Sequence, residues 1–478
     1  MVRPIIVWIR RDLRINDHMA LYHASLKGKP VIPVFILDNE LIRSLPSDGA
    51  VFNFQAEALV ELDDAIRTLG GRLIIRKGNP LQVHRALIKE LQPEALFYNR
   101  DYEPYARVRD EEINDLYNRN SIPVETFKDH VLLEPHEVLT GNNDPYSIFS
   151  PYMRRWKTIP KSAPVGKPKK FSTPAIPSDK IHFAADLKKK VTIPHPAFIG
   201  GISQAEKTWK HFLRTGLSSY GDTRNIPSIQ GTSRISPYLR FGCISIRTLY
   251  NDVTTALEQA PASTSASVES YLNELIWREF YQAVLFHMPW LLQHNFRRQF
   301  DALPWKLDET LLRAWQKGRT GYPLVDAGMR ELNETGWMHN RVRMVVASFF
   351  TKHLMHDWKL GEQYFEQKLL DIEKASNNGG WQWSASTGVD PRPLRIFNPI
   401  LQSEKFDANG DYIKTFVPEL RQVPGKYIHQ PWLMPPLVQQ EAKCVIGRDY
   451  PAPVVDHADA SRRYKEMFTG VQRRRVRT

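Results

Sequence analysis

The chain has 478 residues, of which 42% are hydrophobic, and its 65 Lys and Arg residues outnumber its 52 Asp and Glu residues. This length exceeds one comfortable hydrophobic core, so we expect two domains with a connecting segment, and the apolar stretches are too short for a membrane span of roughly 18 residues. The formal charge of +13 favours a polyanionic partner, with nucleic acid as the leading candidate.

Charge placement and cysteine spacing narrow these expectations. Some of the positive excess lies in Lys161–Lys170 and in the tail Arg473–Arg477, where it serves solubility as readily as binding. Cys243 and Cys444 lack metal-ligand spacing, so we predict no metal site, no disulfide and a reducing compartment. Charges in Met1–Arg14 replace the apolar region that a signal peptide needs, which predicts a soluble, cytoplasmic protein.

The first 131 residues alternate between strand and helix patterns. Short apolar runs predict strands at 5–9, 31–37, 72–75, 95–98 and 124–127, and amphipathic runs predict helices at 50–69 and 81–91. This alternation indicates a doubly wound parallel sheet, a Rossmann-like domain over residues 1–131 that binds ligands where its strands end. The charged segments Trp8–Arg14 and Asn99–Tyr105 fall at two such ends.

Two different patterns follow this domain. Residues 132–200 are rich in Pro, Lys and Ser and lack periodicity, which predicts an interdomain connector, although Pro145–Tyr152 and Arg154–Trp156 place aromatic and basic side chains within it. From residue 201 onward strand patterns vanish, and an all-helical domain is predicted over 201–478, with its last helix ending near Phe468. Its predicted helices include 270–285, 311–317, 325–335, 340–354 and 361–370.

The most informative run is Asn377–Trp383, which sets two indoles and two amides beside a pair of glycines. Such a composition packs poorly as a plain helix, so we favour a site for a large, flat cofactor over a tight helix turn in a crowded core. With Ser386–Gly388 and Arg395–Pro399, the run resembles the flavin-binding signature of the photolyase/cryptochrome family. The resemblance extends over nearly the whole chain, and it is strongest to class I-type photolyases for cyclobutane pyrimidine dimers.

The resemblance implies a fold, a reaction and a partner. The fold is α/β plus all-α, with an N-terminal antenna domain and a C-terminal FAD-binding domain. The reaction is that of a deoxyribodipyrimidine photo-lyase, a carbon–carbon lyase in which excited, reduced, anionic FAD donates an electron to a cyclobutane pyrimidine dimer flipped out of DNA. We therefore expect a monomer that associates with the nucleoid through DNA.

The segment Gly231–Leu239 taken alone predicts a helix start whose hydroxyls and free amides either cap the helix or hold a pyrophosphate. The resemblance assigns it to the flavin diphosphate, and it implies that Arg343, paired with Asp371, lies by the flavin and helps to hold the anionic ring. The implied cofactor-binding residues are Tyr220, Thr232, Ser233, Arg234, Ile235, Ser236, Asn340, Arg343, Asp371, Glu373 and Asn377.

Glu274, Trp277 and Arg278 fall within one helical turn, where they form either an exposed, salt-bridged face or a grip on a base. The resemblance favours the grip, with Glu274 bonding to the dimer and Trp277 stacking on it. Arg341 and Arg343, two positions apart on a helix, must have different partners. The implied DNA- and lesion-binding residues are Arg224, Glu274, Trp277, Arg278, Arg341, Met344, Trp383 and Arg395.

The implied catalytic residues are Glu274, Asn377, Trp305, Trp358 and Trp381. In the family, the residue matching Asn377 faces flavin N5, and the three indoles form a chain along which electrons hop. Scattered indoles are usually core residues, and only the resemblance distinguishes these three. The alternative function is a cryptochrome-type photoreceptor without repair, which is opposed by Met344, by Asn377 where plant cryptochromes have Asp, and by the short tail after Phe468.

Two segments depart from the family pattern, and one site stays open. Glu373 stands where many members have a second Asp, and Asp390–Leu394 is shorter and less aromatic than the usual segment. The resemblance also implies a second, antenna chromophore, either methenyltetrahydrofolate or a deazaflavin. Asp101 and Glu103 resemble contacts to such a chromophore, but they pair as readily with the nearby arginines Arg10, Arg11 and Arg107.

Overall fold

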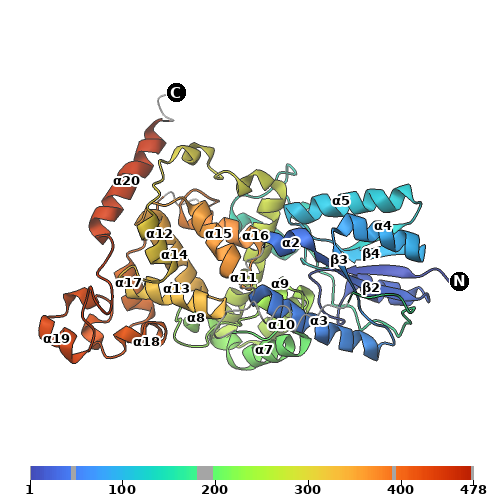
Figure 1. Ribbon diagram of the computed structural model, residues 1–478, viewed down its shortest axis with the longest axis horizontal. Coiled ribbons are helices and arrows are strands. Elements are labelled where there is room, and N and C mark those ends of the chain that lie inside the picture. The colour runs from blue at the N-terminus through green and yellow to red at the C-terminus, as the bar shows by residue number, and fades with distance from the viewer. Residues whose placement is uncertain (1, 45–49, 180–196, 390–393, 475–478) are drawn as a thin grey trace. The chain divides into compact units, whose positions relative to one another are not determined.

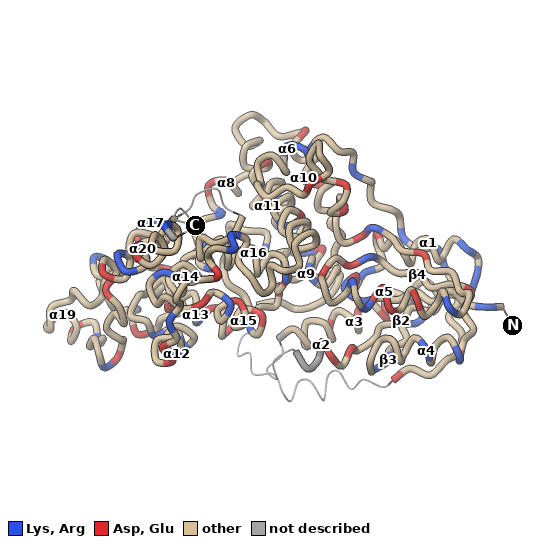
Figure 2. Tube along the Cα trace, turned by 90° about the horizontal axis from the view of Figure 1, so that it is seen from above, with Lys and Arg blue, Asp and Glu red and all other residues tan. Residues whose placement is uncertain are grey.

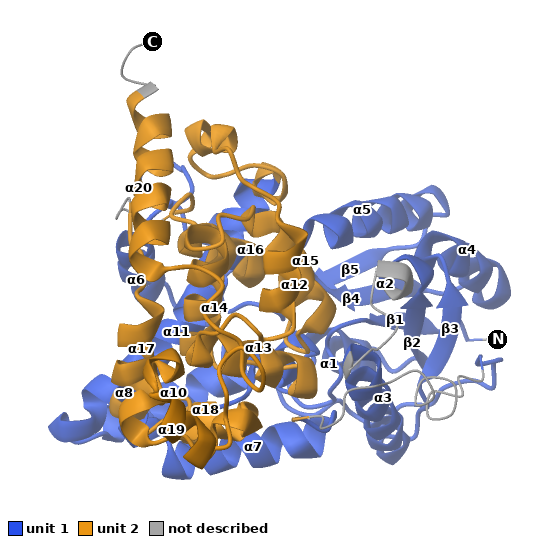
Figure 3. Cartoon of the chain, turned by 60° about the vertical axis from the view of Figure 1, so that its left-hand side comes forward, with its two compact units in different colours: residues 1–192, 198–221, 233–289 blue, residues 193–197, 222–232, 290–478 orange. Residues whose placement is uncertain are grey.

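The computed structural model describes residues 2–44, 50–179, 197–389 and 394–474 (Figure 1), so the predicted departure at Asp390–Pro393 lies outside the described residues. The chain forms two compact units (Figure 3). Unit 1 contains residues 1–192, 198–221 and 233–289, and unit 2 contains residues 193–197, 222–232 and 290–478. These units do not follow the ranges 1–131, 132–200 and 201–478, which stay a prediction about domains.

Unit 1 contains a sheet of five parallel strands in the order β3-β2-β1-β4-β5, which confirms the predicted doubly wound α/β fold. The central strands are apolar and fully buried, as expected for a sheet covered on both faces. The strands are β1 (Ile5–Ile9), β2 (Val31–Asp38), β3 (Ile74–Gly78), β4 (Ala95–Asn99) and β5 (Val124–Phe127).

The predicted strand at 72–75 begins too early. The Leu73 amide donates to Asp63 at 2.7 Å and the Arg72 amide donates to Thr173 at 3.2 Å, so side chains use these groups before strand pairing starts. Pairing with β2 starts at Ile74. β-Strand propensity alone does not predict this competition between side-chain hydrogen bonds and the hydrogen bonds of strand pairing.

Helices cover both faces of the sheet, and Figure 1 shows α4 and α5 on one side with α3 on the other. Helix α4 begins at an asparagine cap, Asn79, whose side chain accepts from the Gln82 amide, and Pro80 occupies its first turn. The helices of this region are α1 (Met19–Leu26), α2 (Asn39–Ser44), α3 (Ala50–Thr68), α4 (Pro80–Leu91) and α5 (Pro104–Arg119).

The predicted connector contains ordered structure that the sequence did not indicate. A short 3-10 helix, η1 (Pro135–Glu137), and helix α6 (Phe149–Thr158) lie within it. Tyr152 and Trp156 of α6 are each 1% exposed, so α6 is packed on one side and is not a free surface crossing. Unit 1 is completed by α7 (Ile202–Thr215), η4 (Leu217–Ser219), α9 (Ser236–Arg240), α10 (Ile246–Gln259) and α11 (Ala262–His287).

Four buried charges lie together inside unit 1. Arg14 donates to both oxygens of Asp129 at 2.7 Å, and Arg247 of α10 bridges Asp17 at 2.9 Å and Asp129 at 2.6 Å. Each of these side chains is 3% or 4% exposed. Burial would raise the pKa of Asp129, but Arg14 and Arg247 together lower it below its usual value. The group fixes α10 against the loops that follow β1 and β5.

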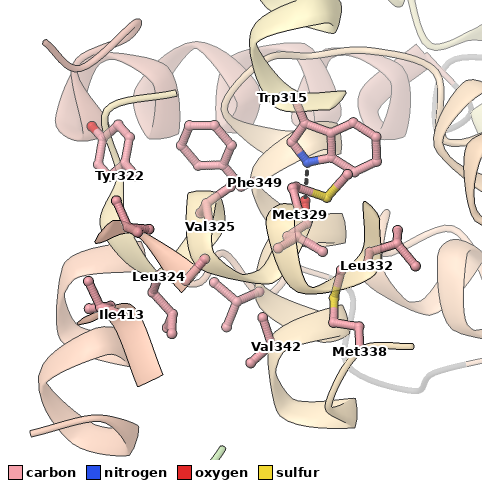
Figure 4. Close-up of a cluster of buried hydrophobic side chains, with 14 of the residues drawn as sticks. Trp315, Tyr322, Leu324, Val325, Met329, Leu332, Met338, Val342, Phe349 and Ile413 are labelled. Atoms are coloured by element: carbon pink, nitrogen blue, oxygen red, sulfur yellow. Dashed lines mark hydrogen bonds between the residues drawn. The ribbon is translucent and has the colours of Figure 1, made fainter. Parts of the chain in front are cut away.

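Unit 2 is helical in its described residues, as predicted for the second part of the chain. Figure 4 shows part of its core, in which Trp315, Met329 and Phe349 come from three helices, and the Trp315 indole donates to the Val346 carbonyl at 3.1 Å. The helices that follow α11 are α12 (Glu309–Gln316), α13 (Pro323–Thr335), α14 (Asn340–Lys352), α15 (Trp358–Lys368), α16 (Lys374–Ser384), α17 (Pro399–Phe406), α18 (Asp411–Phe416), α19 (Pro436–Glu441) and α20 (His457–Arg474). Short 3-10 turns occur at Pro289–Leu292, Arg298–Ala302, Pro418–Leu420, Gly425–Tyr427 and Pro431–Leu433, and the short helix α8 (Tyr220–Thr223) lies earlier in the chain.

Several general features bear on function. Figure 2 shows Lys and Arg residues throughout the described chain, interspersed with Asp and Glu residues, so basic side chains are not confined to Lys161–Lys170 and the tail. Among the described residues, no helix is both long and apolar enough to pass through a bilayer, and no group of three or more His, Cys, Asp or Glu side chains is arranged to hold a metal ion. Cys243 and Cys444 are free thiols, and both are buried.

Candidate functional site

The predicted site residues are divided between the two units. Unit 1 holds Tyr220, Ser233, Arg234, Ile235, Ser236, Glu274, Trp277 and Arg278. Unit 2 holds Arg224, Thr232, Trp305, Asn340, Arg341, Arg343, Met344, Trp358, Asp371, Glu373, Asn377, Trp381, Trp383 and Arg395.

The run Asn377–Trp383 lies in helix α16, so the expectation that it would pack poorly as a plain helix is wrong. The helix turns some residues of the run into the core, where Asn378, Trp381 and Gln382 are each 2% exposed. The Gln382 amide donates to Asn378 at 3.1 Å and to the Leu291 carbonyl at 3.1 Å. These tertiary hydrogen bonds offset the low helix propensity of the two glycines.

Two adjacent amides and a buried carboxyl form a small network on α15 and α16. The Asn377 amide donates to the main-chain carbonyl of Glu362 at 3.1 Å, and the Asn378 amide donates to the Glu362 carboxyl at 3.0 Å. Glu362 is 6% exposed, and burial, followed by repulsion from Glu366, raises its pKa to about 7. Because its amide nitrogen is used in this way, Asn377 keeps its side-chain oxygen as an acceptor.

The three predicted indoles belong to one apolar cluster of unit 2. Trp358 and Trp381 are 0% and 2% exposed, and the partly buried Trp305 packs against the same cluster. Sequence reasoning missed Trp315, a fully buried indole whose ring centroid lies 6.1 Å from that of Trp381. The Trp358 indole donates to Asn295 at 2.9 Å. Exposure therefore increases from Trp381 and Trp358 to Trp305.

Gly361 is required by the position of the Trp381 ring, since a Cβ at this glycine would overlap the indole. We expect Gly361→Ala to lower the free energy of unfolding by about 1–3 kcal/mol, because overpacking a filled core outweighs the better helix propensity of Ala. Urea unfolding of the full-length variant measures this effect.

Gly380→Ala is the matched control in the next helix. A Cβ at Gly380 has no neighbour within 4 Å, so Ala there is expected to raise stability by up to about 1 kcal/mol. If both variants shift the urea midpoint in the same direction, the indole does not constrain Gly361.

Arg341 and Arg343 have different partners, as their spacing predicts. Arg343 makes a two-pronged ion pair with Asp371, at 3.1 and 2.9 Å, and donates to the Met338 carbonyl at 2.7 Å, which confirms the expected Arg343–Asp371 pair. Arg341 donates to the Asn225 side chain at 3.1 and 2.7 Å and lies over the Phe406 ring. Arg341 is therefore held by neutral groups.

Arg341 is repelled by two other arginines assigned to DNA, Arg224 and Arg395. Burial, and then repulsion from Arg224 and Arg395, lowers the pKa of Arg341. Arg395 is exposed and its guanidinium lies 5.3 Å from the Phe397 ring centroid, while Arg224 is half-buried. Like charges gathered on one unit form a surface suited to a polyanion such as a phosphate backbone.

The segment 233–236 forms the start of the short helix α9 in unit 1. Its cap position, Ile235, makes no side-chain cap hydrogen bond, but the Ser233 hydroxyl accepts from the Ile235 amide at 3.5 Å, so both interpretations of this segment stay predictions. The Ser233 hydroxyl accepts from the Tyr271 hydroxyl at 3.0 Å, and the Tyr220 ring packs edge-on against Tyr271 at 5.1 Å. Arg234 has a φ of +51° and lies over the Phe198 ring.

Helix α11 presents a half-buried stripe in unit 1 that includes Glu274, Trp277 and Arg278, one helical turn apart. The positions between and beside them, Leu275, Ile276, Glu279 and Phe280, are buried, so the stripe is the less buried face of this part of the helix. Arg278 donates to the His130 carbonyl at 3.0 Å and to its ring at 2.8 Å.

The remaining predicted residues have varied environments. Asn340 is exposed at the first position of α14, and Met344 on the same helix is half-buried. Glu373, which precedes α16, is 7% exposed and accepts from Ser376 at 3.4 Å. Trp383 is half-buried, with its ring centroid 6.2 Å from that of Phe397, and Thr232 is half-buried.

A pocket lies in unit 1 at the carboxyl ends of β1, β2 and β4, where the strand order reverses. Its lining includes Arg10, Arg11, Asp101, Glu103, Tyr105 and Arg109. Arg11 pairs with Asp101 at 3.4 Å and with Glu103 at 3.1 Å, whereas Arg10 pairs with Asp110. Burial would raise the pKa of Asp101, but Arg11 lowers it.

The expected pairing of the two acids with nearby arginines is therefore confirmed for Arg11. Arg240 is a further partner of Glu103, at 3.6 Å, that sequence reasoning missed. Arg107 instead donates to the Phe286 carbonyl at 3.0 Å. The pocket walls also contain aromatic rings, since the Arg10 guanidinium lies 4.5 Å from the Trp8 ring centroid.

Comparison with known families gives two matches along the chain. Residues 5–172 match the family model for DNA photolyase, and residues 271–470 match the model for the FAD binding domain of DNA photolyase. Together these ranges cover well over half of the chain.

Named relatives match over nearly the full length. The chain is 38% identical to a deoxyribodipyrimidine photo-lyase of Synechococcus sp., covering 98% of this chain and 97% of the relative, and 40% identical to one of Alkalihalophilus pseudofirmus, covering 97% of each. It is also 34% identical to Cryptochrome-1 of Arabidopsis thaliana, covering 97% of this chain and 70% of that protein.

Solved structures give the same result. A bacterial class III photolyase from Agrobacterium tumefaciens has a TM-score of 0.92 at 35% identity, covering 99% of this chain and 98% of that one. An archaeal photolyase from Sulfolobus tokodaii with two FAD molecules has a TM-score of 0.83 at 32% identity, covering 98% and 100%. Similarity is thus not confined to class I-type enzymes.

Proposed function

Because the chain belongs to the photolyase/cryptochrome family, we propose that it repairs cyclobutane pyrimidine dimers in DNA by a light-driven reaction of bound FAD. It is a deoxyribodipyrimidine photo-lyase in its reaction class, splitting carbon–carbon bonds. The observation that carries the proposal is the accessible stripe of Glu274 and Trp277 on α11, since a carboxylate and an indole on one face suit a base that is both bonded and stacked.

The residues present fit FAD by the chemistry of their donors. Unit 1 offers the hydroxyls of Ser233 and Ser236 and the cation of Arg234, which suit a diphosphate. Unit 2 offers the Arg343–Asp371 pair and the Asn377 amide, which suit the polar edge of an isoalloxazine ring. Tyr220, Thr232, Ile235, Asn340 and Glu373 complete the cofactor-binding set that we propose.

When bound and reduced, FAD supplies on excitation the electron that opens the cyclobutane ring. Arg343 contributes fixed positive charge, since Asp371 and the Met338 carbonyl hold its guanidinium in place. The free acceptor oxygen of Asn377 suits an N–H donor of the reduced ring, and this neutral amide adds no charge and no ready proton.

We assign the dimer to a second set of side chains. Glu274 accepts hydrogen bonds from the pyrimidine edge, Trp277 and Trp383 supply stacking faces, and Met344 packs on the apolar ring junction. Arg224, Arg278, Arg341 and Arg395 contact the DNA backbone.

Trp305, Trp358 and Trp381 form the proposed route by which electrons reach the cofactor from the surface. Their support is membership of one cluster in which exposure rises from Trp381 to Trp305. Each indole supplies an aromatic group that is readily oxidised and re-reduced, so the reduced state needed for repair can be restored from outside.

The pocket at the sheet edge is the proposed site of an antenna chromophore, either methenyltetrahydrofolate or a deazaflavin. It lies at the topological switch point and combines aromatic walls with paired charges. The second FAD of the Sulfolobus tokodaii relative makes a flavin a further candidate of the same shape. A monomeric state and a cytoplasmic, nucleoid-associated location stay predictions.

DNA affinity gives one prediction about the arginine cluster. Arg341→Gln is expected to weaken binding to undamaged duplex and to lower the slope of log Kd against log salt by about 1, because one phosphate contact is lost. Titration over a salt series measures this slope. Arg313→Gln is the control, since Arg313 is exposed and paired with Glu309 at 2.7 Å; equal slopes for both variants contradict the assignment.

The proposed function is tested by illuminating the purified, reduced protein with a dimer-containing oligonucleotide under near-ultraviolet or blue light. Chromatography should show that intact pyrimidines return in the light and not in the dark. Glu274→Ala is expected to lower kcat/KM about 10- to 100-fold, the loss typical of a hydrogen bond to a charged group. Glu258→Ala, exposed near the C-terminal end of α10, should repair normally.

The outcomes separate the candidates. Unchanged repair by Glu274→Ala removes the assigned lesion contact. Bound flavin with no repair by the unaltered protein favours a cryptochrome-type photoreceptor.

A further inference from the structure

An aromatic side chain of the predicted connector lies flat against the proposed lesion-stacking indole. The ring centroids of Phe149 and Trp277 are 3.6 Å apart and their planes are within 5° of parallel. Both side chains are half-buried, and both belong to unit 1. Phe149 therefore covers one face of the Trp277 ring, so that only one face is left for another flat group.

Helix α6 holds Phe149 in place because the same face of the helix, one and two turns further on, is anchored to α11. Tyr152 and Trp156 are buried, and the Trp156 indole donates to the Glu279 carboxylate at 2.7 Å. Lys157 makes an ion pair with Glu269 at 2.7 Å. Phe149 is the first residue of this anchored helix, so its ring is presented from a fixed element and not from a free loop.

The surroundings of Trp277 leave it dependent on this support. Phe280 meets the indole edge-on at 5.6 Å, and Tyr281 lies at 5.6 Å with planes inclined by 30°. Neither ring lies flat on the indole as Phe149 does. A half-buried indole without a flat neighbour has rotamer freedom that a stacked base must remove, which reduces affinity.

We propose that Phe149 is a positioning residue of the lesion site, which backs Trp277 and holds the indole plane ready for the flipped-out dimer. This inference rests on the proposed function, because it takes Trp277 as the residue that stacks on the dimer. The opposite arrangement, in which Phe149 occupies the dimer's own place and has to leave, predicts an effect of opposite sign on affinity.

The test is equilibrium binding of the full-length protein in the dark to oligonucleotides with and without a cyclobutane dimer. Phe149→Ala and Phe149→Leu are expected to weaken binding to the dimer about five- to tenfold, since neither restores a flat ring. Phe149→Tyr should bind within about twofold of the unaltered protein, because it keeps the stack. Binding to undamaged DNA should not change.

Three further measurements distinguish positioning from general damage. At saturating DNA the repair rate of Phe149→Ala should equal that of the unaltered protein, so the effect appears in KM and not in kcat. Ile148→Ala, at the exposed neighbouring position, should behave as the unaltered protein in every assay. A parallel Trp277→Ala variant should lose at least as much dimer affinity as Phe149→Ala.

Each other outcome decides against the proposal. Tighter dimer binding by Phe149→Ala means that Phe149 occupies the dimer's place. Unchanged binding by Phe149→Ala with weakened binding by Trp277→Ala overturns the backing role and leaves the proposed function intact. Unchanged binding by Trp277→Ala overturns the lesion-stacking assignment itself. Equal losses for Phe149→Tyr and Phe149→Ala show that the flat ring is irrelevant.

Discussion

Arg247→Ala is expected to lower the free energy of unfolding by about 3–5 kcal/mol, because it leaves two buried carboxylates facing a single guanidinium. Arg247 bonds to Asp17 at 2.9 Å and to Asp129 at 2.6 Å, and it also donates to the Asp17 carbonyl at 3.0 Å. Its side chain is 4% exposed, so water cannot replace these bonds. Urea unfolding of the full-length protein, followed by circular dichroism, measures the loss.

The control for Arg247 is an exposed ion pair of the same unit. Arg119 lies 3.7 Å from Asp115 with its side chain 80% exposed, so Arg119→Ala should change stability by less than about 0.5 kcal/mol. Equal losses for the two variants would show that the buried group adds nothing.

At acid pH, the free energies of unfolding of Arg247→Ala and of the unaltered protein should differ by less than at neutral pH. The pKa of Asp129 is lowered in the folded state, so its contribution to stability is present above the unfolded value of 3.8 and is lost as the pH falls towards the folded value. The deficit should therefore shrink below about pH 4, where the contribution that Arg247 supports disappears from both proteins.

Glu362→Gln is expected to make the protein more stable at pH 8, by up to about 3 kcal/mol, while changing it little at pH 5. Burial raises the pKa of Glu362 from 4.5 to about 7. A raised pKa contributes stability that is fully present below the unfolded value and is lost as the pH rises through about 7, because the buried carboxyl then has to ionise. The Gln side chain does not titrate, so this loss is absent.

Urea midpoints of both proteins at pH 5 and pH 8 measure the effect. Glu366→Gln is the companion variant, because Glu366 adds the repulsion that follows burial as a cause of the raised pKa. Glu366→Gln should shift the titration of Glu362 to lower pH and reduce the loss of stability between pH 5 and pH 8. A Glu362→Gln protein with the same pH dependence as the unaltered one contradicts the assignment of this transition to Glu362.

The neutral carboxyl also matters for the proposed reaction. Glu362 lies one hydrogen bond from Asn378, and its main-chain carbonyl holds Asn377. At the flavin site that we propose near Asn377, a protonated Glu362 would add no negative charge to that of a reduced cofactor. We therefore expect its ionisation to oppose the reduced anionic state at alkaline pH.

Sequence patterns predicted the sheet well because its strands are short, apolar and buried on both faces. The sequence also predicted that Arg341 and Arg343 have different partners, because two residues that are two positions apart on a helix point in different directions. The run Asn377–Trp383 was misjudged in its backbone, because its glycines lower helix propensity while hydrogen bonds from Asn378 and Gln382 to Leu291 restore the helix.

The features that sequence reasoning missed depend on residues far apart in the chain. Helix α6 forms because Tyr152 and Trp156 are buried against α11. The Pro- and Lys-rich sequence around α6 gives no local sign that α11 lies there. The Phe149–Trp277 stack and the bonds of Arg247 to Asp17 and Asp129 likewise join distant positions. No periodicity within either segment encodes such pairs.

The paired charges around the pocket of unit 1 have a practical consequence. Arg11 and Arg240 already neutralise Asp101 and Glu103, so these side chains keep their positions without a bound ligand. A chromophore bound there can therefore dissociate during purification without unfolding the protein. If the proposed antenna chromophore binds there, separate preparations of the protein should differ in absorbance spectrum and in repair rate under weak light, but agree in repair rate under light strong enough to excite the flavin directly.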